Sequence, residues 1–301
     1  MRLPSRRTTA AIACVLAVAA VAFWWLTRPD PLPASALPAH TADLANGEVM
    51  YHAGSCFACH KPPAGAAKPG LPSGGLPFKT PIGVFYPQNL TPDAETGLGR
   101  WSESDFVNAM VRGLAPDGRH YFPAFPYMAY RAMRVTDLLD LRGYLMSLEP
   151  VKAVHPAHGV PQLGLARRGV GLWKRLAFAR PPHSPASEGS DSWKRGAYLV
   201  NAPGHCGECH TPKSWLMIED LGRYMAGGPH PGGEGKVPSL RGLLAREKYE
   251  DVSNLTLALQ NGEELGYEDL SSGGMAAIQE NLGKLPEADV RAIAEYLLSL
   301  K

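Results

Sequence analysis

The apolar residues along the chain form one long uninterrupted run and several shorter amphipathic segments. The run from Ala10 to Leu26 contains seventeen residues without a charge, which is the short end of what a membrane span needs. Near the other terminus, one helical face collects Val290, Ile293, Ala294, Leu297 and Leu298. No stretch shows a convincing alternation of apolar and polar residues. The pattern predicts an all-α fold preceded by one apolar N-terminal helix.

Helical periodicity recurs in two sets of three segments, separated by loops rich in glycine and proline. We expect an opening, a middle and a closing helix in each set, at about 41–53, 102–113 and 135–148, and again at about 191–202, 251–261 and 286–300. Ser102 is followed three residues later by Asp105, which predicts a capping box at the start of the first middle helix.

The two sets belong to a repeated unit that carries the motif C-x-x-C-H. The motif occurs at Cys56–His60 and again at Cys206–His210. A glycine precedes it by nine residues in the first copy and by ten in the second, and a segment of the form A-x-x-x-G starts 49 and 48 residues after the histidines. A Tyr-Leu-x-Ser-Leu segment then begins 84 and 86 residues after them. Landmarks in matching order predict a tandem duplication.

The C-x-x-C-H motif has the spacing that attaches haem c. Its cysteines can form thioethers with the two vinyl groups of one haem, and the adjacent histidine can bind the iron. Zinc would need a second cysteine pair at each site, and a thioredoxin-like dithiol would need a βαβ context, neither of which the sequence offers. We therefore predict two covalently attached haem c groups, with Cys56, Cys59, Cys206 and Cys209 as attachment residues and His60 and His210 as proximal ligands.

Methionines downstream of each motif are candidates for the ligand on the opposite side of the iron. In the second unit we predict Met275, because Met217 and Met225 follow the motif too closely to leave its proximal side. In the first unit both Met128 and Met133 precede the closing helix, and the spacing of small c-type cytochromes favours Met128. A methionine that only packs in the core is the alternative for each position.

The repeat and the motifs together predict two tandem class I cytochrome c domains, at 41–149 and 191–301, joined by a linker at 150–190. Composition agrees with a folded protein, since 45% of the 301 residues are hydrophobic and 19% are charged. The net charge of +2 argues against a nucleic-acid binder. Five cysteines, four of them in the motifs, are too few for a disulfide scaffold.

Positive charges are distributed unevenly around the apolar run. Three arginines precede it and one follows, which predicts an N-terminus in the cytoplasm and the rest of the chain outside. We favour an uncleaved single-pass anchor at 1–28 in a bacterial inner membrane, followed by a Pro-rich tether at 29–40. A signal peptide cut near Ala34–Ala36 is the alternative, and it would leave a soluble periplasmic protein.

The linker contains a basic amphipathic segment from Leu163 to Arg180. Its arginines and lysine are interleaved with leucine, tryptophan and phenylalanine, a composition that suits a helix docked on a membrane surface or a partner. The competing interpretation, which we favour, is a linker that packs its apolar residues across the seam between the two units.

Several stretches resemble the membrane-associated cytochrome c subunits of bacterial dehydrogenase complexes that oxidise alcohols, gluconate, fructose and aldehydes. The resemblance covers most of residues 42–301. It rests on segments around both motifs, namely Asn89–Asp93, Thr96–Gly99 with Trp101, Gly118–Tyr121, Pro123–Tyr127, Gly204–Pro212 and Ala226–Pro229. Many members carry three haem motifs, and this chain, with two, resembles a shorter diheme variant.

The resemblance implies a relay that takes electrons from a periplasmic dehydrogenase and passes them to a quinone, another cytochrome or a terminal oxidase. The family commonly has a methionine at the position of Met133, so the resemblance favours Met133 over Met128. Histidine–methionine ligation of both irons would leave no site for a substrate. The alternative is a diheme enzyme with one catalytic haem, either a peroxidase or a protein similar to thiosulfate dehydrogenases.

Overall fold

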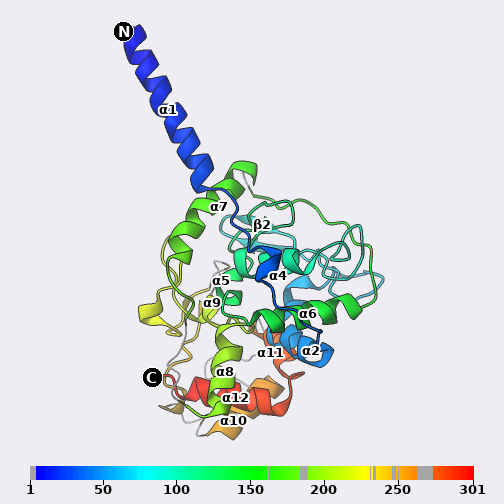
Figure 1. Cartoon of the computed structure of the whole chain (residues 1–301). Helices are drawn as coiled ribbons and strands as arrows, with labels where there is room; N and C mark the ends of the chain where they lie inside the picture. The colour runs from blue at the N-terminus through cyan, green and yellow to red at the C-terminus, as the bar shows by residue number, and fades with distance from the viewer. Residues whose placement is uncertain are drawn as a thin grey trace.

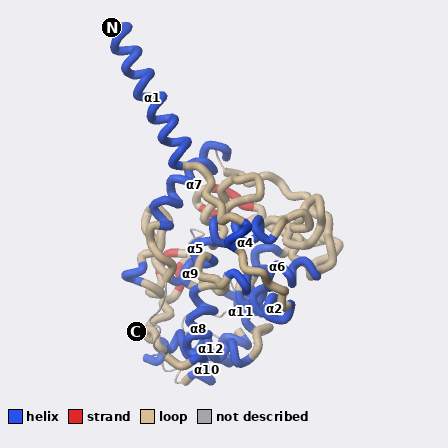
Figure 2. Tube along the Cα trace, in the orientation of Figure 1, coloured by secondary structure: helices blue, strands red, loops and turns tan. Residues whose placement is uncertain are grey.

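The computed structural model describes residues 5–160, 163–183, 189–230, 232, 235–245, 249, 251–262 and 274–301. Helices dominate the described residues, which confirms the mostly helical prediction (Figures 1 and 2). The described strands, which the sequence pattern did not predict, form two small antiparallel pairs inside loops. They are β1 (Phe78–Thr80) with β2 (Gly83–Phe85), and β3 (Gly228–Pro229) with β4 (Lys236–Val237). These pairs are too short to form a sheet with a core of its own.

A single long helix, α1 (Arg6–Leu26), projects from the body of the molecule (Figure 1). Ser5 caps it by accepting a hydrogen bond from the backbone N–H of Thr8 at 3.2 Å. No residue of α1 is buried. Within the described part of the chain it is the one helix long and apolar enough to cross a membrane, and it fits either an anchor or a signal sequence.

In the first half of the body, the opening helix α2 (Leu44–Ala53) packs against the closing helix α6 (Val135–Ser147). Gly47 makes this close approach possible, because a Cβ atom there would lie 2.2 Å from the carbonyl oxygen of Asp140. The Asp140 carboxylate also accepts a hydrogen bond from Asn46 Nδ2 at 2.8 Å. The two helices thus pack closely at Gly47 and are joined by a side-chain hydrogen bond.

The second half repeats this arrangement with α8 (Asp191–Asn201) and α12 (Glu287–Leu298), which pack against each other. A Cβ atom at Gly196 would lie 1.8 Å from the carbonyl oxygen of Ala292. Each half therefore has a glycine of its opening helix pressed against the backbone of its closing helix. The paired glycines are the ones that precede each C-x-x-C-H motif by nine and ten residues.

Shorter helices complete the two halves. The middle helices are α4 (Glu103–Arg112) and α10 (Val252–Asn261), and both bury part of their length. The first half adds α5 (Tyr127–Tyr130). The second half adds α11 (Gly274–Leu282), which was not predicted as a helix and which contains Met275 in its first turn. Single turns of 3-10 helix occur at Ala34–Ala36, Leu221–Arg223 and Leu243–Ala245.

Local signals explain where the middle helices begin and end. Ser102 and Asp105 form the predicted capping box, each side chain accepting a hydrogen bond from the other residue's backbone N–H. Gly113 ends α4 at φ 58° and Gly262 ends α10 at φ 79°. This left-handed conformation favours glycine and terminates the helix.

The halves share one continuous apolar core, in which α11 of the second half contacts α2 of the first. Polar contacts across the seam add to this packing. Tyr198 donates a hydrogen bond to the carboxylate of Asp137, and the guanidinium of Arg134 lies 4.7 Å from the centre of the Tyr198 ring. The two halves are therefore packed against each other and not merely linked.

The basic linker segment forms helix α7 (Leu163–Phe178). Val170 and Ala177 are buried, and Trp173 donates from Nε1 to the carbonyl oxygen of Leu216 at 2.7 Å. This side of α7 packs on both halves, as the seam-packing interpretation predicted.

A buried lysine on α7 ties the linker to the first half. Lys174 Nζ donates to the carbonyl oxygens of Arg112 at 2.6 Å and Gly113 at 2.7 Å, at the C-terminal end of α4. It also lies 3.2 Å from His120 Nδ1, and His120 Nε2 lies 2.9 Å from the carbonyl oxygen of Thr27. His120 is buried because it links the end of α1 to α7.

The environment of Lys174 predicts a pH-dependent stability. Burial lowers the pKa of Lys174 to about 7 in the folded protein, against about 10.4 in an unfolded chain. The unfolded state therefore binds more protons in this window, so the free energy of unfolding should rise between about pH 7 and pH 10. Lys174→Met should flatten that rise by on the order of a few kcal/mol, measured by urea unfolding at several pH values. Equal slopes for the two proteins would contradict the prediction, because their other titrating groups are shared.

Candidate haem attachment sites

The first motif forms a short helix, α3 (Cys56–His60), directly after α2. Ser55, between the two helices, has φ 46°, so the chain turns through a left-handed residue before the first cysteine. His60 Nδ1 lies 2.6 Å from the carbonyl oxygen of Gln88. Because a carbonyl only accepts, this contact assigns the ring proton to Nδ1 and leaves the Nε2 lone pair for a metal.

The second motif is built in the same way. Helix α9 (Gly207–His210) follows Cys206, and His205 before that cysteine has φ 40°. His210 Nδ1 lies 2.8 Å from the carbonyl oxygen of Pro238. In both copies the accepting carbonyl belongs to the residue 28 positions after the histidine. The two sites thus have the same geometry at the same spacing.

Burial keeps both histidines in the form that can bind iron. It lowers the pKa of His60 to about 4 and lowers the pKa of His210 below its ordinary value. Both rings are therefore neutral at neutral pH. A neutral imidazole oriented by a carbonyl is the usual state of a metal-binding histidine.

The surroundings of the motif cysteines differ from those of reactive thiols. None of them forms a disulfide. Burial raises the pKa of Cys56 and of Cys206 to about 12, whereas redox-active dithiols have lowered values. In the described ranges no group of three or more histidine, cysteine and acidic side chains could hold a metal ion. A thiol pair beside a neutral histidine fits haem c.

The methionine candidates lie in different surroundings. Met133 is buried in the shared core, against which both Cys56 and Cys206 pack. Met128 is half-buried and lines a cavity beside the second motif. Met275 is half-buried on α11 and packs on the shared core, while Gly273 before it lies outside the described residues. Met225, which follows the second motif too closely to be predicted as a distal ligand, is fully buried.

The two motif segments lie against each other, which the sequence pattern did not predict. His205 Nε2 lies 3.3 Å from the carbonyl oxygen of Gly54. The His205 ring also meets the Tyr130 ring edge to face, with centroids 5.6 Å apart. His205 directly precedes the second motif, and Gly54 lies two residues before the first. The histidine directly before the second motif was the one sequence feature that could have indicated this contact. Its partners, Gly54 and Tyr130, lie in the other half of the chain, so spacing could not identify them.

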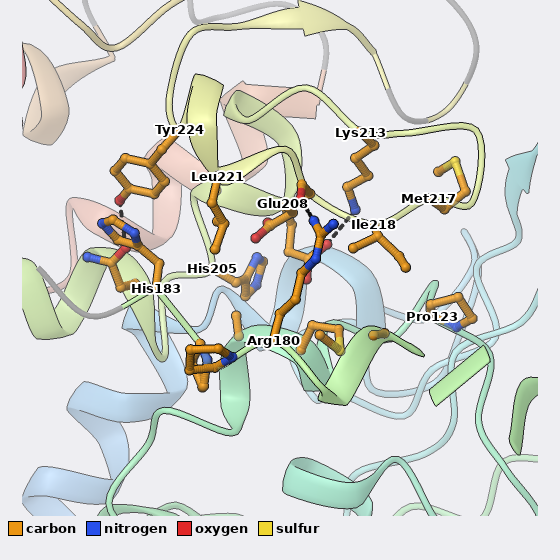
Figure 3. A pocket seen from close by; sticks show the side chains of 18 of the residues that line it. Pro123, Arg180, His183, His205, Glu208, Lys213, Met217, Ile218, Leu221 and Tyr224 are labelled. Atoms are coloured by element: carbon orange, nitrogen blue, oxygen red, sulfur yellow. Dashed lines mark hydrogen bonds and ion pairs between the residues drawn. The ribbon is translucent and has the colours of Figure 1, made fainter. Parts of the chain in front are cut away.

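A cavity next to the second motif collects charged side chains (Figure 3). Glu208, inside the motif, forms a 2.5 Å ion pair with Lys213. Glu219 lines the same cavity, and burial, helped by the nearby Glu208 carboxylate, raises its pKa to about 7. His183 stacks on Tyr224 with centroids 3.8 Å apart. These residues come from the linker, from the motif itself and from the loop after it, so sequence spacing gave no sign of the cavity.

Comparison with known proteins identifies the family. No family model matches the sequence. A diheme cytochrome c-type protein of Cereibacter sphaeroides is 35% identical over 293 residues, which are 97% of this chain and 97% of that protein. This chain belongs to the same c-type cytochrome family. Members of the family carry covalently bound haem c, and the name of this relative supports two haems.

Other relatives of this cytochrome are parts of dehydrogenases. The fructose dehydrogenase cytochrome subunit of Gluconobacter japonicus is 32% identical over 276 residues, which are 90% of this chain and 54% of that subunit. A nicotinate dehydrogenase subunit of Pseudomonas putida is 36% identical over 288 residues, which are 95% of this chain and 24% of that subunit. The cytochrome thus spans about half of one relative and a quarter of the other. These relatives support an electron-transfer role for the family.

Proposed function

We propose that the protein is a membrane-anchored diheme cytochrome that relays electrons from a periplasmic dehydrogenase to the respiratory chain. The acceptor would be a quinone, another cytochrome or a terminal oxidase. The observation that carries the proposal is the matched pair of C-x-x-C-H segments, each with its histidine oriented by a carbonyl 28 residues later. Haem c, once attached, supplies the one-electron iron couple that such a relay needs.

Some residues of the chain would attach the haems, and others would bind the iron or orient its ligands. Cys56 and Cys59 would hold the first haem, and Cys206 and Cys209 the second. His60 and His210 would be the proximal ligands, with Gln88 and Pro238 fixing their ring orientation. Helix crossings at Gly47 and Gly196 support two tandem class I cytochrome c domains, at 41–149 and 191–301.

Helix α1 would anchor the protein in the bacterial inner membrane with both haem domains in the periplasm. Its exposed apolar surface and the tryptophans at its C-terminal end, Trp24 and Trp25, support this placement. The mass of the mature protein isolated from membranes tests it directly. A chain that begins near residue 37 would show that the segment is a cleaved signal.

The distal ligands would be Met133 in the first half and Met275 in the second. Met133 is buried in the shared core, whereas Met128 is half-buried and lines the cavity beside the other motif, and this difference supports Met133. Met133→Leu keeps the volume but removes the sulfur, so one of the two haems should become high-spin and bind cyanide. Absorption and EPR spectra measure this change. Met128→Leu is the matched control, and a high-spin haem in that variant instead would reverse the assignment.

The relay itself is tested with the native complex. Extraction of the tagged protein from its own membranes in mild detergent should bring a dehydrogenase with it, identified by mass spectrometry. Substrate of that dehydrogenase should then reduce both haems, seen as their reduced absorption bands. If the isolated cytochrome turned over peroxide or thiosulfate by itself, it would be a haem enzyme and the proposal would be wrong.

A further inference from the structure

A strip of exposed leucines runs along the outer side of α7. Leu165, Leu172 and Leu176 are 64%, 43% and 56% exposed. Spacings of seven and four residues place them on one face of the helix. The inner face already buries Val170 and Ala177, so the strip is a second apolar face that the described residues leave uncovered.

The strip lies next to the C-terminal end of α1. A Cβ atom at Gly171 would lie 2.7 Å from the carbonyl oxygen of Thr27, so α7 passes directly beneath the end of α1 (Figure 1). Arg168 Nη2 donates to the carbonyl oxygen of Trp24 at 2.8 Å, and Arg175 Nε donates to that of Leu26. These bonds cap the last turn of α1 and fix α7 to it.

Arginine and tryptophan side chains gather where the two helices meet. The guanidinium of Arg168 lies 4.0 Å from the centre of the Trp24 ring, and that of Arg28 lies 5.0 Å from the centre of the Trp25 ring. Both tryptophans are more than half exposed. Tryptophan and arginine are the residues that settle at the headgroup level of a bilayer.

We propose that the outer face of α7 lies on the membrane surface, with the three leucines in the interfacial region and the arginines among anionic headgroups. The charge of α7 favours lipid, because the helix carries no acidic residue and Arg168 and Arg175 lie beside the strip, whereas Lys174 is buried on the inner side. Continuity with the end of α1 favours it too, since a span ending at Leu26 puts the neighbouring strip at the same depth. The inference rests on the proposed anchor.

This placement would give the haem-bearing body a fixed orientation. The cytochrome would then stand on the bilayer through two contacts, α1 and α7, instead of swinging on one tether. In this orientation α10 and α12 lie at the end of the body away from α1 (Figure 1). That end would face the periplasm and the first half would face the membrane.

Site-directed spin labelling of the full-length haem-loaded protein tests the proposal. Once the four motif cysteines hold haem, Cys14 within α1 is the only free thiol. Single-label proteins are made at Cys14 itself and, in a Cys14→Ser background, at Leu165→Cys, Leu172→Cys and Leu176→Cys. Leu257→Cys on α10, where the leucine is 51% exposed, is the matched control at the far end.

Each labelled protein is reconstituted in vesicles of phosphatidylethanolamine and phosphatidylglycerol. Collision of the nitroxide with oxygen, which concentrates in lipid, is compared with collision with a water-soluble nickel chelate. We expect the oxygen-to-nickel ratio at the three strip positions to exceed that at Leu257 severalfold, with unchanged haem content.

The outcomes separate this proposal from the anchor. A lipid-like ratio at Cys14 together with water-like strip positions would overturn the α7 proposal and leave the anchor intact. Strip labels shielded from both oxygen and nickel would point to a protein partner or a second copy, and would also overturn it. A water-exposed label at Cys14 would remove the anchor and the α7 proposal together.

Discussion

Replacing Cys206 and Cys209 by serine is expected to leave a protein with one covalently bound haem instead of two. Serine oxygens do not form the thioether links, and no other cysteine in the second half can replace them. The polypeptide mass after denaturation should fall by one haem, and the haem absorbance per chain should fall by half. The low-spin spectrum that remains should belong to the first site.

The reciprocal change at Cys56 and Cys59 should remove the other haem, and Cys14→Ser should remove none. Loss of both haems from either double variant would mean that one site cannot assemble without the other. Retention of two haems would show that the motif cysteines are not the attachment residues, and the proposed function would lose its basis.

Much of the helical framework could be predicted from the sequence because its signals are local. The capping box at Ser102 and Asp105 and the apolar stripe of the last helix each act within a few residues of chain. The opening, middle and closing helices of both halves begin and end within about three residues of the predicted bounds, which is ordinary for helix ends. Haem attachment could likewise be predicted from the motif alone, because the two cysteines and the histidine lie within five consecutive residues.

What could not be predicted depends on residues that are distant along the chain. His205 meets Gly54 and Tyr130 only because the two halves pack together. His120 is buried because the end of α1 and helix α7, both distant from it in sequence, contact it. The periodicity of α7 predicted one packed face, but its second apolar face becomes visible only once the packed side is known.

Gly196→Ala is expected to lower the free energy of unfolding by about 1–3 kcal/mol or more, the usual cost of overpacking a tight contact. The new methyl group would sit 1.8 Å from the carbonyl oxygen of Ala292, so α8 and α12 would have to separate. Chemical unfolding of the haem-loaded protein measures the loss. Gly47→Ala, at 2.2 Å from the carbonyl oxygen of Asp140, should behave alike if the halves share one design.

Gly169→Ala supplies the control, because a Cβ atom at this helical position on α7 meets no atom within 4 Å. Alanine there should instead stabilise the protein by roughly 0.5–1 kcal/mol through its better helix propensity. The opposite signs separate a steric effect at the helix crossing from any general effect of replacing glycine. A neutral Gly196→Ala would mean that the opening and closing helices can move apart freely, and the paired crossings would then no longer support two cytochrome domains.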